Sequence, residues 1–130
     1  MGMSRIEVGD LGERLVCRLL SSQGFSVRRL KPGQGPDVIA TDKSGAVVKI
    51  EVKAACKGRD NKWRATLVKE GHTNHNKSDI VMLICLSSSG VTIFVIPVRD
   101  IQNRRHIAIT SDPATYRGMF AKYRQDKLSL

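Results

Sequence analysis

Strict alternation of apolar and charged residues marks the segment 47–55 as a β-strand. Its apolar side chains are those of Val48, Ile50, Val52 and Ala54. Lys49, Glu51 and Lys53 point to the opposite face, because successive side chains of a strand alternate. The pattern therefore predicts a strand with one face in the core and one charged face.

Other apolar segments predict the rest of a sheet. The expected strands span 25–30, 37–41, 63–68, 80–86 and 91–98, with a short edge strand at 107–110. The two continuous apolar runs, 80–86 and 91–98, are typical of strands at the centre of a sheet. Ser87 to Gly90 provide the turn between them.

Helical periodicity appears at both ends of the chain. Ser4 and Glu7 have the spacing of a capping box, so a helix is expected from there to Gln23, with Gly24 as its stop. A second, basic helix is expected over about 112–126. Together these elements predict a mixed α/β fold with a central sheet. We expect one domain over 1–130, with its core at about 4–98.

One face of the first helix combines apolar residues with an acid. That face is expected to carry Ile6, Gly9, Val16, Cys17 and Leu20, with Glu13 in its middle. A carboxylate on an apolar face is costly to bury without compensation, so Glu13 is a candidate site residue. Gly9 and Gly12 are unfavourable inside a helix and indicate close approach of a neighbouring element or a ligand.

The turn between the strands at 37–41 and 47–55 brings two acids together. Residues 42–45 are Asp-Lys-Ser-Gly, a good turn sequence. A turn centred on Lys43 and Ser44 places Asp37 opposite Ile50, whereas a bulge at Gly45 places it opposite Glu51. Opposed residues have Cβ atoms about 5 Å apart, so either register brings both carboxylates within reach of one divalent cation.

Composition points to nucleic acid as the partner. The chain has 22 Lys and Arg against 12 Asp and Glu, a net charge of +10. The basic residues expected to follow a phosphate backbone are Lys57, Arg59, Lys62, Arg64, Lys69 and Lys77. No apolar run approaches the roughly 20 residues of a membrane span, and no secretory leader is visible. The three cysteines are widely spaced, so we expect buried thiols in the reducing cytoplasm.

In this arrangement the chain resembles the PD-(D/E)XK nuclease superfamily. Pro36-Asp37 and Glu51-Val52-Lys53 match its motif, and Glu13 matches an acid on the preceding helix of many members. The resemblance covers about residues 9–98 and implies a restriction-endonuclease-like fold, a central mixed sheet flanked by helices. It also implies a Mg²⁺-dependent DNA endonuclease, with Mn²⁺ expected to substitute.

The resemblance implies a role for each site residue. Asp37, Glu51 and the Val52 carbonyl would hold the metal, which prefers oxygen ligands. Lys53 would orient or deprotonate the attacking water, or stabilise the developing charge. Glu13 would bind a second metal ion or a metal-bound water.

Within the superfamily two kinds of enzyme fit a chain this short. The layout is slightly closer to homing endonucleases than to archaeal-type Holliday junction resolvases, which usually carry a longer amphipathic helix after the lysine strand. Here a basic, polar stretch follows Lys53 instead. One chain holds one site, so cutting both strands calls for a dimer or tetramer. The alternative from another class is a non-catalytic DNA-binding module on the same fold.

Overall fold

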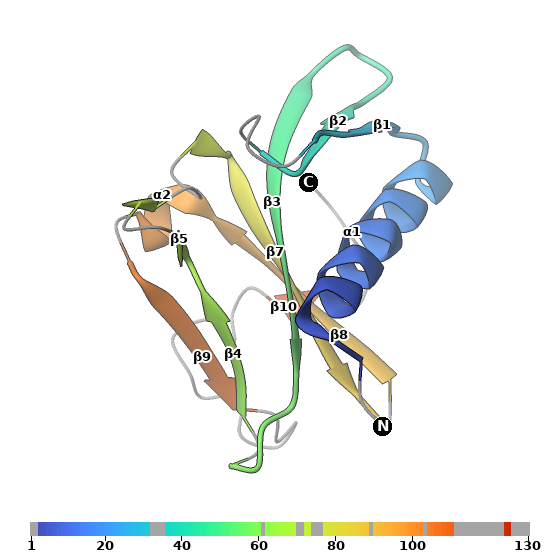
Figure 1. The fold of residues 1–130 in the computed structure, drawn as a ribbon. Helices are drawn as coiled ribbons and strands as arrows, with labels where there is room; N and C mark the ends of the chain where they lie inside the picture. The colour runs from blue at the N-terminus through green and yellow to red at the C-terminus, as the bar shows by residue number, and fades with distance from the viewer. Residues whose placement is uncertain are drawn as a thin grey trace.

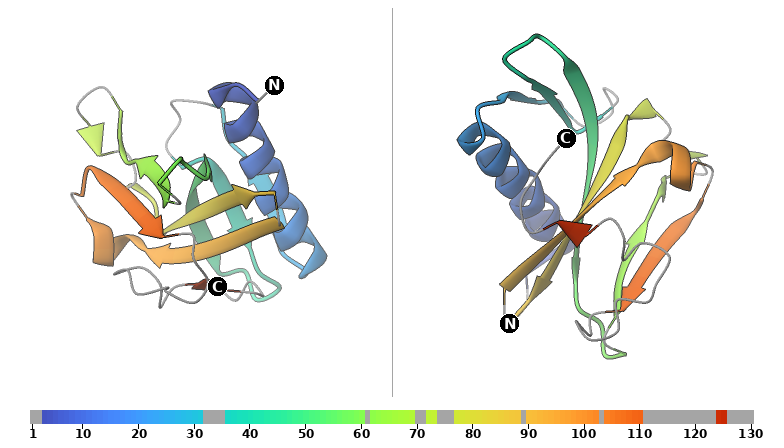
Figure 2. Two further views of the ribbon diagram at one scale, coloured as in Figure 1. Left: turned by 90° about the horizontal axis from the view of Figure 1, so that it is seen from below. Right: turned by 180° about the vertical axis from the view of Figure 1, so that it is seen from behind.

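The structure is a computed structural model that describes residues 3–31, 36–60, 62–69, 72–73, 77–88, 90–102, 104–110 and 124–125. A six-stranded sheet forms its middle layer. Helix α1 covers one face of this sheet, and the strand pair β4–β9 covers the other (Figures 1 and 2). The expected mixed α/β architecture is confirmed.

The described residues form two helices and ten strands. The helices are α1 (Arg5–Ser22) and α2 (Val98–Ile101). The strands are β1 (Ser26–Arg29), β2 (Val38–Thr41), β3 (Val47–Cys56), β4 (Lys62–Thr66), β5 (Val68–Lys69), β6 (His72–Thr73), β7 (Ile80–Ser87), β8 (Gly90–Pro97), β9 (His106–Thr110) and β10 (Arg124–Gln125).

The central sheet has the order β1-β2-β3-β7-β8-β10. Only β3 and β7 run parallel among these neighbours, with Glu51 beside Val81, and the other pairs are antiparallel. The two apolar runs expected at the centre form β7 and β8, and β7 lies directly against β3. Their buried side chains divide into two cores, one facing α1 and one facing β4–β9.

Helix α1 begins with the expected capping box. Ser4 Oγ accepts from the Glu7 amide at 3.2 Å, and the Ser4 amide donates to Glu7 Oε1 at 3.1 Å. The chain leaves the helix at Gly24, whose φ of 95° suits glycine. The end signals in the sequence therefore located both boundaries to within a residue.

The expected apolar face of α1 was partly wrong. The buried residues are Val8, Gly12, Val16 and Leu20. Ile6 is 85% exposed, because it lies about 200° around the helix from Val8, at 100° per residue. The row Val8, Gly12, Val16 and Leu20 is buried, and Leu15, Cys17 and Leu19 pack beside it against the same core.

Of the two unusual glycines, only Gly12 lies against a neighbour. A Cβ built on Gly12 would stand 2.7 Å from Ala54 Cβ on β3, whereas one on Gly9 would have nothing within 4 Å. Gly12 thus allows α1 to approach the strand that carries Glu51 and Lys53. The expectation that a neighbouring element approaches Gly9 closely is wrong, and approach of a ligand there stays a prediction.

The cysteines also differ from expectation at one position. Cys85 is buried and Cys17 is half-buried, but Cys56 is exposed. Cys56 is the last residue of β3, beyond Ala54, where α1 packs against the strand. All three are free thiols.

The basic helix expected over 112–126 lies largely outside the described residues. Where the structure describes it, at Arg124 and Gln125, the chain is strand β10 and not helix. These two residues pair antiparallel with Phe94 and Ile93 of β8. The pairing occupies backbone groups that β8 would otherwise leave open at the edge of the sheet.

Candidate active site

The β2–β3 hairpin sets the register of the site. Asp42 Oδ1 accepts from the amides of Ser44 and Ala46, each at 2.9 Å, and Gly45 has a φ of 91°. The loop pairs Thr41 with Val47 and Val38 with Ile50. Continuing this register by one residue places Asp37 beside Glu51, which is the arrangement expected for a bulge at Gly45.

Asp37 is bound to β3 through both its backbone and its side chain. Its amide donates to the Ile50 carbonyl at 3.0 Å, and its Oδ2 accepts from the Val52 amide at 2.9 Å. The carboxylate is therefore fixed on the segment of β3 between Glu51 and Lys53.

Glu51 is a carboxylate buried in the sheet, with 7% of its surface exposed. Burial raises its pKa to about 7; the nearby Asp37 carboxylate raises it as well, and the Lys53 ammonium offsets part of the rise. Lys53 Nζ lies 3.6 Å from Glu51 Oε1, so both side chains point the same way. They share the face of Ala55, whose methyl is in the core next to β4–β9.

Glu13 reaches the same region from α1. Arg29, on β1, donates from Nη2 to Glu13 Oε2 at 2.9 Å and to Asp10 Oδ1 at 3.0 Å. Burial raises the pKa of Glu13, and the charge of Asp37 raises it further, against the lowering effect of Arg29. Sequence reasoning missed Arg29. Arg29 lies two residues after Val27 on β1, so both side chains point to the same face of the strand. Val27 packs against the core next to α1, and this spacing was the signal in the sequence that Arg29 faces α1.

The described side chains fit a hard divalent cation held by few protein ligands. Within the described residues, no three His, Cys, Asp or Glu side chains form a metal-binding group, so Glu13 does not complete a three-acid cluster with Asp37 and Glu51. The two carboxylates are nevertheless close enough that Asp37 raises the pKa of Glu51. Mg²⁺ is commonly bound by one or two carboxylates, with waters and substrate phosphates as its other ligands. A cation there would neutralise the charge of buried Glu51 and half-buried Asp37.

Known proteins resemble this chain in structure and not in sequence. No family model matches it, and no curated protein matches it in sequence. Its structure is similar to that of a bacterial homing endonuclease, I-Ssp6803I, with a TM-score of 0.73 and 17% identity over 95% of this chain and 89% of that one. The Holliday junction resolvase Hjc of Archaeoglobus fulgidus gives a TM-score of 0.49 and 18% identity, over 84% of this chain and 87% of that one.

The chain has the restriction-endonuclease-like fold. On this fold, the bend before β2 supplies Asp37, β3 supplies Glu51 and Lys53, and α1 supplies Glu13. No described helix has both the length and the apolar character needed to cross a membrane.

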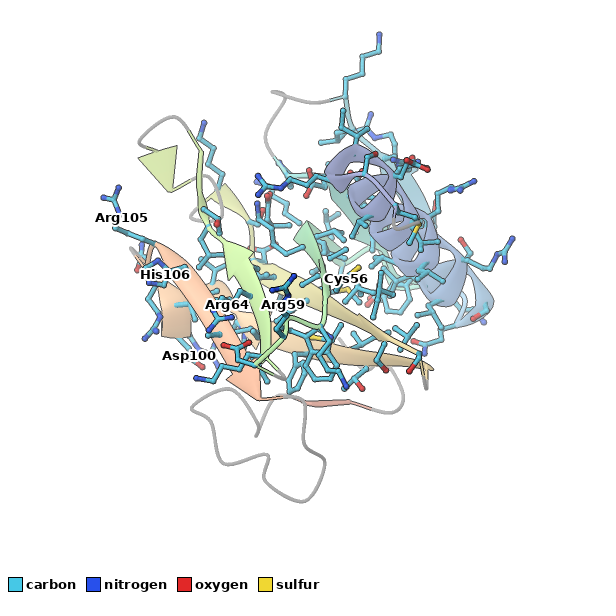
Figure 3. All side chains as sticks on the ribbon, turned by 60° about the horizontal axis from the view of Figure 1, so that its bottom comes forward. Cys56, Arg59, Arg64, Asp100, Arg105 and His106 are labelled. Atoms are coloured by element: carbon cyan, nitrogen blue, oxygen red, sulfur yellow. The ribbon has the colours of Figure 1, made fainter. Side chains whose placement is uncertain are left out.

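Several of the expected DNA-binding residues follow the last residue of β3 in the chain. Lys57 and Arg59 are exposed in the connection to β4, and Lys62 and Arg64 are exposed on β4 itself (Figure 3). Lys77 is exposed before β7. Lys69 belongs to β5, but its side chain lies outside the described residues.

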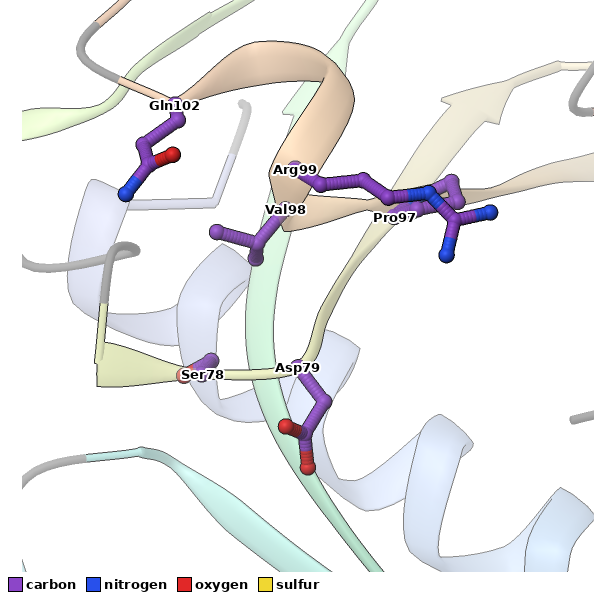
Figure 4. A pocket seen from close by; sticks show the side chains of 6 residues that line it. All are labelled: Ser78, Asp79, Pro97, Val98, Arg99 and Gln102. Atoms are coloured by element: carbon purple, nitrogen blue, oxygen red, sulfur yellow. The ribbon is translucent and has the colours of Figure 1, made fainter.

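A pocket opens where β7 begins and β8 ends. Its volume is about 370 Å³. Asp79 and Ser78 line it from one side, and Pro97 and α2 from the other (Figure 4). Asp79 Oδ2 accepts from the Lys49 amide at 2.8 Å, two residues before Glu51. This bond aligns the start of β3 with β7.

Proposed function

We propose that this protein is a metal-dependent DNA endonuclease that hydrolyses phosphodiester bonds. The observation that carries the proposal is the grouping of Asp37, which directly precedes β2, with Glu51 and Lys53 on the neighbouring strand β3. The fold shared with a homing endonuclease and the net charge of +10 support a DNA substrate.

In this proposal Asp37, Glu51 and the Val52 carbonyl hold Mg²⁺, and Mn²⁺ can replace it. The bound metal would supply a Lewis acid and lower the pKa of its water. The hydrogen bond from the Val52 amide holds the Asp37 carboxylate in place before any metal arrives. Such preorganisation reduces the reordering needed when the substrate binds.

Lys53 would stabilise negative charge next to these carboxylates. Its ammonium group, 3.6 Å from Glu51 Oε1, is placed to donate to the attacking water or to a phosphate oxygen as negative charge develops. Glu13 would serve a second metal ion or a metal-bound water. For this, the ion pair between Arg29 and Glu13 has to open, since Arg29 now holds that carboxylate.

The substrate would be held mainly through its phosphates. Lys57, Arg59, Lys62, Arg64, Lys69 and Lys77 are the proposed DNA-binding residues. Their contacts would release counterions, so that binding weakens with salt. Because one chain provides one site, cutting both strands of a duplex requires a symmetric dimer or tetramer.

Cleavage and binding should separate in site variants. Asp37→Asn and Lys53→Ala are expected to abolish cleavage of plasmid DNA in Mg²⁺ while leaving DNA affinity within a few-fold of wild type. Lys49→Ala is the matched control, because Lys49 is exposed two residues before Glu51 on the same face of β3. It should cleave at the wild-type rate.

Substrate choice tests the alternatives. Purified protein is incubated with linear duplex, single-stranded DNA and a synthetic four-way junction, each with Mg²⁺ and with EDTA. Cleavage of duplex DNA supports the proposal, and cleavage confined to the junction identifies a resolvase. If no substrate is cut with any divalent metal although DNA binds, the protein is a binding module.

A further inference from the structure

Strands β4 and β9 form a two-stranded ribbon with two chemically different faces. The register pairs Trp63 with Ile109 and Ala65 with Ile107, and these four side chains are buried. The alternate positions are exposed. They form what we call the ribbon face: Lys62, Arg64, Thr66, His106 and Ala108.

The ribbon is rigidly attached to the catalytic part of the fold. Its buried side chains join a core with Val81 and Leu83 of β7 and Phe94 of β8. Trp63 Nε1 also donates to the Leu86 carbonyl at 3.0 Å. The ribbon thus lies on the side of the central sheet that carries Glu51 and Lys53, and it follows β3 after a short connection at 57–61.

The exposed chemistry of the ribbon is basic and polar. Arg64 stands opposite Ala108 on β9, and the small side chain of Ala108 leaves space beside the guanidinium group. Arg64 pairs with Asp60, Nη1 to Oδ1 at 3.0 Å, with both side chains about half exposed. Arg59 lies in the connection before β4, and Arg105 directly precedes β9 (Figure 3). An exposed pair of this kind contributes little to stability and can be exchanged for a DNA contact at small cost.

We infer that the ribbon face enters the major groove of duplex DNA and reads base edges, with Arg64 as the main specificity-determining residue. This inference rests on the proposed function. The major groove, about 12 Å wide, admits a two-stranded ribbon. Positions 62, 64 and 66 are spaced by about 6.8 Å, close to two base-pair steps. An arginine there can bind guanine O6 and N7 with two hydrogen bonds.

Two groups of residues would then have different roles in binding DNA. Lys57 and Arg59, in the connection before the ribbon, would contact phosphates and position the duplex. Arg64, Thr66 and His106 stand on paired strands with a fixed register and would discriminate between bases. Neither Thr66 nor His106 belongs to the basic set recognised in the sequence.

The experiment is a selection from a library of duplexes with a randomised central segment. Binding is selected in EDTA, so that cleavage does not remove the bound DNA. Wild type, Arg64→Ala and the control Arg18→Ala are compared, because Arg18 is exposed on α1, on the other side of the sheet. Circular dichroism melting confirms that each variant is folded.

We expect wild type and Arg18→Ala to enrich the same sequence. Arg64→Ala should bind the unselected library within a few-fold of wild type, but lose about 5- to 100-fold of preference at one or two adjacent base pairs. An unchanged enriched sequence in Arg64→Ala overturns the inference. If wild type enriches nothing yet cleaves plasmid with Mg²⁺, the inference fails while the proposed nuclease stands. If wild type neither binds nor cuts DNA, both fail.

Discussion

At the scale of single residues, the ionised form of Glu51 destabilises the folded protein. Glu51 is buried beside Asp37, and its pKa is raised to about 7 from 4.5. A raised carboxyl pKa means that the folded state prefers the proton, so ionisation opposes folding. Lys53 offsets only part of this cost, so the ionised form of Glu51 remains destabilised.

This cost predicts how the metal-free stability varies with pH. Between the unfolded pKa of 4.5 and the folded value of about 7, the folded state keeps a proton that the unfolded state has released. The free energy of unfolding therefore falls as pH rises through that window. Glu51→Gln removes the effect. In EDTA at about pH 8 it should be more stable than wild type by on the order of 2 kcal/mol in urea denaturation, and nearly equal at about pH 4.5.

Glu7→Gln is the control with the opposite sign. The hydrogen bonds of Glu7 to the backbone and side chain of Ser4 lower its pKa, so its charge favours folding above the unfolded pKa. That variant should lose stability at about pH 8, where Glu51→Gln gains it. Equal free energies of unfolding for wild type and Glu51→Gln at that pH would show that ionised Glu51 does not destabilise the folded protein.

At the scale of elements, the contact between α1 and β3 positions the site. Gly12 lies against Ala54, next to Lys53, and a Cβ at position 12 would stand 2.7 Å from Ala54 Cβ. Neither atom belongs to a flexible side chain, so a larger residue has to push the helix and strand apart.

Two glycine substitutions on the same helix should therefore act in opposite directions. Gly12→Ala is expected to lower the free energy of unfolding by about 1–3 kcal/mol, through overpacking against β3. Gly9→Ala has open space around its new methyl group and should raise stability by about 0.5–1 kcal/mol. Urea denaturation of both variants tests this. Stabilisation by Gly12→Ala would mean that the helix is not closely packed there.

The elements also show which features local sequence could specify. Ser4, Glu7 and Gly24 fix the ends of α1 through hydrogen bonds within a few residues, so the helix was predictable. The hairpin was predictable down to two registers, and the conformation of Gly45 decides between them. The pairing of β4 with β9 was not predictable, because the paired residues lie 40 or more positions apart in the sequence, as Thr66 and His106 do. No local signal in the sequence joins the two strands. The exposure of Ile6 likewise depends on where α1 leaves the sheet.

At the scale of the whole molecule, a basic chain brings four of its 12 acidic residues close together. The net charge is +10, yet Asp10, Glu13, Asp37 and Glu51 influence one another electrostatically. Lys57 and Arg59 follow directly on β3, the strand that carries Glu51. Under the proposed function, the net positive charge would attract DNA and the acidic spot would bind the cation. The motif residues and the charge were available from sequence, whereas the link between Arg29 and Glu13 required the fold.

The salt dependence of DNA binding measures how many phosphates the basic residues contact. Arg59→Ala should reduce the slope of log K against log salt concentration by about 0.9, the value for one lost phosphate contact. Arg18→Ala, on the outer side of α1, should leave the slope unchanged. A slope identical to wild type for Arg59→Ala would remove the connection at 57–61 from the DNA interface.

The most direct measurement of the central claim is the nicking of supercoiled plasmid by wild type and Glu51→Gln, each assayed in Mg²⁺ and in EDTA. The account predicts cleavage by wild type in Mg²⁺ only, and a loss of at least about a hundredfold in the variant, since removing one group that stabilises developing charge costs 10²–10³ in rate. Cleavage by Glu51→Gln at the wild-type rate in Mg²⁺, or by wild type in EDTA, would contradict it.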